Sequence, residues 1–180
     1  MKSMGLIVLS LCALFAVAEN KRVESVEISA LPAPQRTAIV AALKRWDRRL
    51  GRKPVDDLQA STGSTLVDTV HLGLAEGNDL VLTDRSSCSP TGNCSILVLR
   101  AAQGRYRVVL DGIGQTYSIK RDRTNGFRNI ELSMHGSAAE STIKAYKFNG
   151  SRYLRVGCYN VIFATSDGTE LDRPRTTPCP

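Results

Sequence analysis

Short β-type runs separated by turn dipeptides fill the chain from residue 65 to residue 165, and no other sequence feature constrains the fold as strongly. The runs cover residues 66–74, 80–83, 95–100, 106–110, 116–119, 130–134, 142–148, 153–156 and 160–165. The gaps between them contain Gly77-Asn78, Gln103-Gly104, Asn125-Gly126 and Asn149-Gly150, and Asn-Gly pairs favour tight hairpin turns. Because short turns join antiparallel neighbours, the pattern predicts an antiparallel, mainly β body.

Two stretches of this β body resemble each other. Asn78–Thr83 is echoed by Arg128–Ser133, and Ser95–Tyr106 is echoed by Ser141–Tyr153. Each copy contains a strand, a variable loop, a hairpin and a further strand, and the two tyrosines are 153 − 106 = 47 residues apart. Two such units are too few to close a propeller. We therefore expect two related hairpin units that pack as a sandwich or as one strongly twisted sheet.

One amphipathic helix is predicted before the β body, at about residues 34–50. Its apolar residues are Ile39, Leu43, Trp46 and Leu50, at intervals of 4, 3 and 4, which places them on one helical face. We expect this face to pack on the sheet. The opposite side carries a run of cations formed by Lys44, Arg45, Arg48, Arg49 and Arg52, with Lys53 beyond. Such a face either binds an anion or stays in solvent, and we favour the solvated interpretation because cations near a helix C-terminus interact favourably with its dipole.

The first 18 residues have the form of a secretory signal peptide. Lys2 precedes an apolar run that ends in the small residues Ala16-Val17-Ala18. The run is shorter than the roughly 20 apolar residues of a transmembrane helix. Cleavage after Ala18 would leave one domain, residues 19–180, with a net charge of 23 − 17 = +6 and a C-terminal tail at 166–180. The sequence thus predicts a secreted or periplasmic protein without a transmembrane segment.

Four cysteines would remain after cleavage, and an even number of cysteines in an exported domain indicates disulfides. A turn sequence separates Cys88 from Cys94 and brings their ends together, so we expect the pairs Cys88–Cys94 and Cys158–Cys179. The competing interpretation is a zinc site, but the usual C-x2-4-C spacing is missing. Cys12 lies within the apolar run, where lipid attachment is the alternative to cleavage. No cofactor fingerprint stands out, and neither a metal nor a cofactor is predicted.

The stretch from Asn129 to Tyr153 carries two resemblances. It contains a strand, a His-Gly-Ser-Ala loop, a second strand, a Phe-x-Gly turn and a Tyr ahead of a Cys. This series resembles a unit of exported bacterial proteins of unknown function, over about residues 70 to 160; the resemblance implies a fold but no activity. More distantly, the series is similar to periplasmic inhibitors of invertebrate-type lysozyme, whose β-sandwich offers a Ser/Gly-rich loop to the lysozyme active-site cleft.

The lysozyme-inhibitor resemblance implies that residues 135–141 form the presented loop. The loop departs from the inhibitor pattern, because it contains Ala138-Ala139 and its Tyr146 lies further into the next strand. The candidate binding residues here are His135, Gly136, Ser137 and Glu140. An imidazole, a hydroxyl and a carboxylate could also perform nucleophilic or acid/base catalysis. However, residues of one short loop seldom form a triad, and no G-x-S-x-G turn surrounds the serine.

A second candidate binding region is a basic loop containing Lys120, Arg121 and Arg123, which we expect between the two repeats. The positive net charge would attract an anionic envelope polymer. Aromatic residues make up only 6% of the chain, so a stacking platform for single-stranded nucleic acid is not expected. The preferred function is a non-enzymatic binding or inhibitory module whose partner is an envelope or extracellular protein. The alternatives are a small envelope-acting hydrolase that uses His135 with a nearby carboxylate, and a structural envelope protein.

Overall fold

The computed structural model describes residues 25–51, 64–74, 77–165 and 167–179, so the predicted signal peptide lies outside the described residues. Along the chain the elements are β1 (Val26–Glu27), a 3-10 turn η1 (Ile28–Ala30), α1 (Ala33–Arg49), β2 (Thr65–Val70), β3 (Asp79–Asp84), a 3-10 turn η2 (Arg85–Ser87), β4 (Cys94–Ala102), β5 (Arg105–Gly114), β6 (Thr116–Thr124), β7 (Phe127–Ser137), β8 (Glu140–Phe148), β9 (Tyr153–Ala164) and β10 (Glu170–Pro178).

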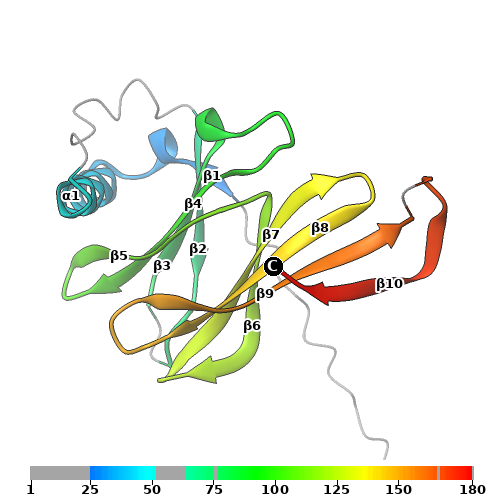
Figure 1. The fold of residues 1–180 in the computed structure, drawn as a ribbon. Coiled ribbons are helices and arrows are strands. Elements are labelled where there is room, and N and C mark those ends of the chain that lie inside the picture. The colour runs from blue at the N-terminus through cyan, green and yellow to red at the C-terminus, as the bar shows by residue number, and fades with distance from the viewer. Residues whose placement is uncertain (1–24, 52–63, 75–76, 166, 180) are drawn as a thin grey trace, which may run out of the picture.

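The strands form two antiparallel five-stranded sheets, with the orders β1-β2-β3-β4-β5 and β10-β9-β8-β7-β6. Within each sheet, strands that are neighbours in the sequence pair with each other, and the chain passes from one sheet to the other between β5 and β6. Figure 1 shows α1 beside the first sheet, on the side away from the second. The prediction of a mainly β, antiparallel fold with one helix packed on it is confirmed, and the sandwich is the arrangement adopted.

The hairpin turns follow the dipeptides that predicted them. Gln103 and Gly104 both have positive φ, at 52° and 71°, as do Asn125 and Gly126, at 50° and 79°. Two consecutive residues with positive φ are typical of the type I′ turn, whose twist matches that of the flanking strands. Asn149 begins a longer turn, in which its side-chain oxygen accepts hydrogen bonds from the backbone amides of Ser151 and Arg152.

The helix packs on the first sheet through the face that its sequence predicted. Ile39 and Ala42 are buried, and Leu43 and Trp46 are partly buried. They pack against a cluster formed by Ile28, Val67, Leu80, Leu82, Leu99 and Val108. Leu50 is 43% exposed, contrary to expectation, because it is the C-cap residue at φ −88° and ψ 0° and no longer follows the helical periodicity.

A second core lies between the two sheets. Its buried residues include Val81, Ile96, Val98 and Leu110 of the first sheet and Ile130, Leu132, Phe148 and Tyr153 of the second. The sheets approach closely at Gly112, where a Cβ atom would lie 2.5 Å from Leu132 Cδ1. Arg100 reaches across from the first sheet, and its guanidinium carbon lies 4.4 Å from the centre of the Phe127 ring. This core fixes the second sheet against the first.

The sequence repeat corresponds to a duplication of strand register. Leu80 pairs with Leu99 in the first copy, and Ile130 pairs with Tyr146 in the second. The ladder that joins the last two strands of each copy is irregular at one point, directly before Leu99 and directly before Tyr146. Both the pairing and the position of the β-bulge are therefore repeated.

The duplication extends one strand further than the sequence comparison indicated. Val67 of β2 lies opposite Leu82, and Tyr117 of β6 lies opposite Leu132. Tyr117 lies 117 − 67 = 50 residues after Val67, and Leu132 lies 132 − 82 = 50 residues after Leu82, so the two pairs are equivalent. Each copy is thus a four-stranded meander, β2-β5 or β6-β9, and β1 and β10 are added at the two ends.

The two copies are stacked so that equivalent faces of their sheets point in the same direction. Leu80 and Leu82 face the helix, whereas their equivalents Ile130 and Leu132 face the first sheet. The face of the second sheet that carries Glu131 therefore corresponds to the face of the first sheet that is buried between the layers. In the parts of the chain that the structure describes, no helix covers that face.

Three segments differ from the expectations. Lys120, Arg121 and Arg123 belong to strand β6, inside the second repeat, and not to a loop between the repeats. The segment expected as a tail forms β10, which pairs with β9. The loop expected over 135–141 is short, because β7 continues to Ser137 and β8 begins at Glu140. In each case cross-strand hydrogen bonds extend the ladder through polar residues that carry little strand signal.

Both predicted disulfides are confirmed. Cys88 is bonded to Cys94 and encloses the loop between β3 and β4, and Cys158 of β9 is bonded to Cys179 just after β10. Disulfides of this kind persist in oxidising compartments. Among the described residues, no helix is both long and apolar enough to cross a membrane.

Candidate functional site

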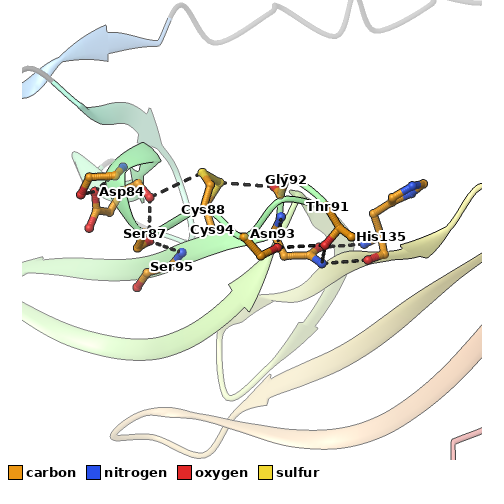
Figure 2. The surroundings of a disulfide bond; sticks show 11 residues. Asp84, Ser87, Cys88, Thr91, Gly92, Asn93, Cys94, Ser95 and His135 are labelled. Atoms are coloured by element: carbon orange, nitrogen blue, oxygen red, sulfur yellow. Dashed lines mark hydrogen bonds between the residues drawn. A yellow bond between two sulfur atoms is a disulfide. The ribbon is translucent and has the colours of Figure 1, made fainter.

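The disulfide loop of the first repeat is clamped to the end of β7 in the second repeat. The Asn93 side chain accepts a hydrogen bond from the His135 amide through Oδ1 and donates one to the His135 carbonyl through Nδ2, both at 2.8 Å. The Asn93 side-chain amide thus forms with His135 the pair of hydrogen bonds that the backbone of a neighbouring β-strand would form (Figure 2). Because both backbone groups of His135 are satisfied, this single side chain fixes the position of the β7–β8 hairpin relative to the disulfide.

The loop that carries Asn93 is itself held by local hydrogen bonds. Ser87 Oγ donates to the Asp84 carbonyl at 2.7 Å and accepts from the Ser95 amide at 2.8 Å, so it bridges the two ends of the loop. Asp84 Oδ1 accepts from the Ser86 amide at 2.9 Å. Together with the disulfide, these bonds restrict the conformations open to the loop, so the clamp is preorganised.

The turn between β7 and β8 is also anchored to β9. The Ala139 carbonyl accepts a hydrogen bond of 2.7 Å from the Phe163 amide. Ser137 Oγ accepts a hydrogen bond of 3.2 Å from the Ala139 amide. The turn is therefore fixed on one side by the disulfide loop and on the other by β9.

A mostly apolar groove of about 450 Å³ adjoins this turn. Its lining residues are Ala138, Ala139, Phe163, Ala164, Gly168, Glu170, Leu171 and Pro174. Phe163 is 41% exposed, so a large aromatic surface lies beside the groove in contact with solvent. Glu170 adds one carboxylate to an otherwise apolar lining. This combination of apolar walls and a single charged group is typical of a site that binds another molecule.

The turn that follows Phe163 has a fixed shape. Asp167 Oδ1 accepts hydrogen bonds from the Thr165 hydroxyl and, at 3.1 Å, from the Thr169 amide. These bonds, with the Thr165 hydroxyl first, hold the pKa of Asp167 below its usual range, because they stabilise the ionised form. Asp167 therefore links Thr165 to Thr169 across the turn, directly before Gly168 of the groove lining.

The four residues predicted for the presented loop lie together at this end of the molecule, but they do not form a catalytic set. The His135 imidazole points away from the disulfide loop (Figure 2), and among the described residues no carboxylate forms a hydrogen bond with it. The Ser137 hydroxyl is engaged with the turn backbone. The Glu140 side chain lies against Gly136, whose Cβ would be 3.2 Å from Glu140 Oε1. The arrangement therefore stabilises a hairpin, and within the described part of the chain no hydrogen bond links the His135 ring to Ser137 or Glu140.

The predicted basic residues of β6 are divided among different roles. Arg123 Nη1 donates to the Leu72 carbonyl at 2.9 Å, so it joins the two sheets. Lys120 Nζ lies 3.0 Å from Glu131 Oε2, and the hydrogen bond and charge of Glu131 raise the pKa of Lys120. Arg121 is exposed on the edge strand. Among the described residues, only Lys120 is paired with an acid, while Arg123 donates to backbone carbonyls. The role of the three residues in binding an anion stays a prediction.

No family model, curated protein or solved structure matches the chain. The roles of its residues are therefore argued from geometry and chemistry alone. Within the described parts of the chain, no group of three or more His, Cys, Asp or Glu side chains could hold a metal ion.

The sequence indicated the hairpin but not the groove beside it. The sequence pattern predicts a tail that includes Leu171 and Pro174, although the predicted bond between Cys158 and Cys179 requires that segment to return to β9. That bond was the signal that could have placed a strand there. Asn93 carried no comparable signal, because its partner lies 135 − 93 = 42 residues away and is a backbone group.

Proposed function

We propose that the protein is a secreted or periplasmic, non-enzymatic binding module that presents the β7–β8 hairpin and the adjoining groove to a protein partner. The observation that carries this proposal is the anchoring of one short hairpin from two sides, by Asn93 and by the Phe163 amide, next to an apolar groove with an exposed phenyl ring. A rigid loop beside an apolar surface loses little conformational entropy on binding.

The chemistry of the groove favours a protein partner over an anionic polymer. Its walls are apolar, and its one charged lining residue, Glu170, is negative. An anionic chain would be repelled by this carboxylate, whereas an apolar side chain of a partner could occupy the groove and bury Phe163. Buried aromatic anchors of this kind contribute much of the binding energy at protein interfaces.

The test is retention of a purified partner by the oxidised domain after substitution of Phe163. Phe163→Asp places a charge in the groove, and we expect it to weaken binding at least tenfold. Val156→Asp is the matched control, since Val156 lies on the same strand, is 56% exposed and does not line the groove. Equal retention of the partner by both variants would exclude the groove as the binding site.

The narrower proposal is that the partner is a cell-wall lytic enzyme whose cleft accepts the hairpin. It rests on the sequence resemblance to lysozyme inhibitors and on the position of Gly136 at the end of β7. Addition of the domain to an invertebrate-type lysozyme should slow hydrolysis of peptidoglycan, and Gly136→Trp should abolish the effect while the circular dichroism spectrum stays unchanged. Undiminished hydrolysis at a saturating concentration of the domain would remove this form of the proposal.

A further inference from the structure

The disulfide of the first repeat encloses the residue that holds the hairpin of the second. Asn93 directly precedes Cys94, and the bond from Cys94 to Cys88 closes a ring around it. The bond spans only 6 residues, so its structural effect is confined to one short loop. That effect is passed on to the other repeat, because the Asn93 side chain in this loop binds the His135 backbone (Figure 2).

The hydrogen bonds around Asn93 inside the loop are open to water. The Asn93 amide donates to Ser89 Oγ at 3.2 Å, and Asn93 Nδ2 donates to Thr91 Oγ1 at 2.9 Å. The Ser89 amide donates to the Asn93 carbonyl, and the Gly92 amide donates to the Ser89 carbonyl, both at 2.8 Å. Water competes for exposed groups of this kind, so each bond contributes little net stability. The covalent bond is therefore the part of the loop whose loss most affects the position of Asn93.

Each sulfur atom of this disulfide already lies beside an acceptor for a thiol proton. Cys88 Sγ lies 3.8 Å from the Asp84 carbonyl oxygen, and Cys94 Sγ lies 3.3 Å from the Gly92 carbonyl oxygen (Figure 2). A disulfide sulfur carries no proton, whereas a thiol is a weak donor. Both carbonyls can therefore accept a hydrogen bond from the thiol that reduction creates.

The second disulfide has only half of this arrangement. Cys179 Sγ lies 3.7 Å from Asn160 Oδ1, but among the described residues no acceptor is placed to bind a proton on Cys158 Sγ. A disulfide whose reduced form is stabilised is the more readily reduced. The comparison indicates that the Cys88–Cys94 bond opens before the Cys158–Cys179 bond.

We propose that the Cys88–Cys94 bond is a redox switch that sets the rigidity of the β7–β8 hairpin and is opened by a dithiol reductant. Cys94 is 8% exposed and Cys88 is half-buried, so a thiolate of the dithiol attacks Cys88 Sγ. The Cys88–Cys94 bond breaks as a mixed disulfide forms, and Cys94 leaves as a thiolate that takes up a proton. The second thiolate of the dithiol then displaces Cys88, which takes up another proton. The protein gains two electrons and two protons, and the dithiol becomes a disulfide.

Reduction frees the two ends of the loop, so the Asn93 side chain is less often in position to bind the His135 backbone. The turn of the hairpin stays attached to β9 through the Ala139 carbonyl, and the Cys158–Cys179 bond still holds β10. The change is therefore confined to the end of β7. Its effect on a partner rests on the proposed function of the hairpin, whereas its effect on the rigidity of the hairpin does not.

Amide hydrogen exchange measures the switch directly. The folded protein is treated with dithiothreitol at a concentration at which alkylation and mass spectrometry show that the Cys88–Cys94 bond alone is open. Exchange at the His135 amide should then be at least about tenfold faster than in the oxidised protein. Cys88→Ser combined with Cys94→Ser keeps the loop open permanently and should give the same acceleration. Cys158→Ser combined with Cys179→Ser is the matched control, and it should leave exchange at the His135 amide unchanged.

The proposal is overturned if the His135 amide is equally protected with the Cys88–Cys94 bond closed and open, or if the Cys158–Cys179 bond opens first. Inhibition of an invertebrate-type lysozyme by the oxidised and reduced forms separates the switch from the proposed function. Faster exchange with weaker inhibition by the reduced form supports both. Faster exchange with the same inhibition, or none, in both forms supports the switch and contradicts the hairpin as the binding element.

Discussion

Gly112 and Tyr159 occupy equivalent positions in the two repeats and have opposite surroundings. Gly112 pairs with Ile96 in the first sheet and faces the layer below, where Leu132 leaves no room for a side chain. Tyr159 pairs with Ile143 in the second sheet, and its hydroxyl donates to Glu131 Oε1 at 3.2 Å. Gly112 thus permits the two sheets to pack closely, whereas Tyr159 lies on the outer face of the second sheet and makes a polar contact there.

Gly112→Ala should lower the free energy of unfolding by about 1–3 kcal/mol, because its Cβ would overlap Leu132 Cδ1 in the core between the sheets. Urea denaturation of the oxidised protein measures the change. Gly157→Ala is the control, since its Cβ would lie 3.7 Å from the nearest neighbouring atom, Ala145 Cβ. A loss of stability in Gly157→Ala as large as in Gly112→Ala would show that close packing is not the cause.

A partly buried hydrogen bond joins the sheets at Tyr117. Its hydroxyl donates to Asp68 Oδ2 at 2.7 Å, while Asp68 Oδ1 is buried without a hydrogen-bond partner among the described residues. Burial first, and then the hydrogen bond and charge of Asp68, raise the pKa of Tyr117 far above its usual range. The phenol therefore stays protonated in the folded protein at a pH where the unfolded chain ionises.

This shift makes stability depend on alkaline pH. Above about pH 10 the unfolded state releases the Tyr117 proton and the folded state does not, so the free energy of unfolding falls as pH rises. Tyr117→Phe should cost about 1–3 kcal/mol at neutral pH, because the Asp68 carboxylate loses its donor, and it should flatten the decline above pH 10. Urea denaturation across this pH range tests both effects, and an unchanged alkaline slope would contradict the assignment.

At the scale of elements, the clamp between the disulfide loop and β7 decides how the hairpin is held. Backbone pairing to β8 alone would leave the last residues of β7 at a frayed end of the ladder. The two hydrogen bonds from the Asn93 side chain hold the His135 backbone as pairing with a further strand would. The loop that supplies them is longer than its counterpart in the second repeat, so the insertion in one copy stabilises the turn of the other.

Asn93→Ala should release the hairpin without unfolding the protein. The expected result is faster hydrogen exchange at the His135 amide and a loss of about 1–3 kcal/mol in the free energy of unfolding, since two backbone groups lose their partner. Thr91→Ala serves as the control, because Thr91 contacts Asn93 but not the His135 backbone. Equal protection of the His135 amide in the Asn93 variant and the native protein would show that the clamp does not hold the hairpin.

At the scale of the whole molecule, the two disulfides constrain the chain over different lengths. The Cys88–Cys94 bond spans 6 residues and the Cys158–Cys179 bond spans 21. In the loop-entropy model, the shorter bond contributes about 2 kcal/mol and the longer about 3 kcal/mol. The longer bond also ties β10, one wall of the groove, to the rest of its sheet.

Replacement of Cys158 and Cys179 by serine should therefore lower the free energy of unfolding by about 3 kcal/mol and weaken binding at the groove, because β10 is no longer held at its end. The double serine variant of Cys88 and Cys94 should lose about 2 kcal/mol and keep the groove. Urea denaturation measures the free energy of unfolding of both variants. The rate of protease cleavage within β10 reports whether this strand is still held. If β10 is cleaved at the same rate in both variants, the Cys158–Cys179 bond does not hold this strand.

The sequence by itself determined the class of fold, because its information is local. Turn dipeptides and period-two runs located the strands, the stripe that includes Ile39 and Trp46 located the helix, and the spacing of the cysteines indicated their pairing. The repeat also indicated which hairpins were related. Each of these signals arises from residues that are close in the chain or share one chemical type.

Only the tertiary structure decided how the sheets stack and where binding sites form. The stacking, with equivalent faces pointing in the same direction, places Gly112 between layers and Tyr159 outside, although both belong to equivalent strands. The groove requires β10 beside the β7–β8 turn, and the core under the helix requires Val108 of β5 beside α1. Such sites depend on contacts between residues that are distant in the sequence, and neither hydrophobic periodicity nor turn chemistry specifies which distant surfaces meet.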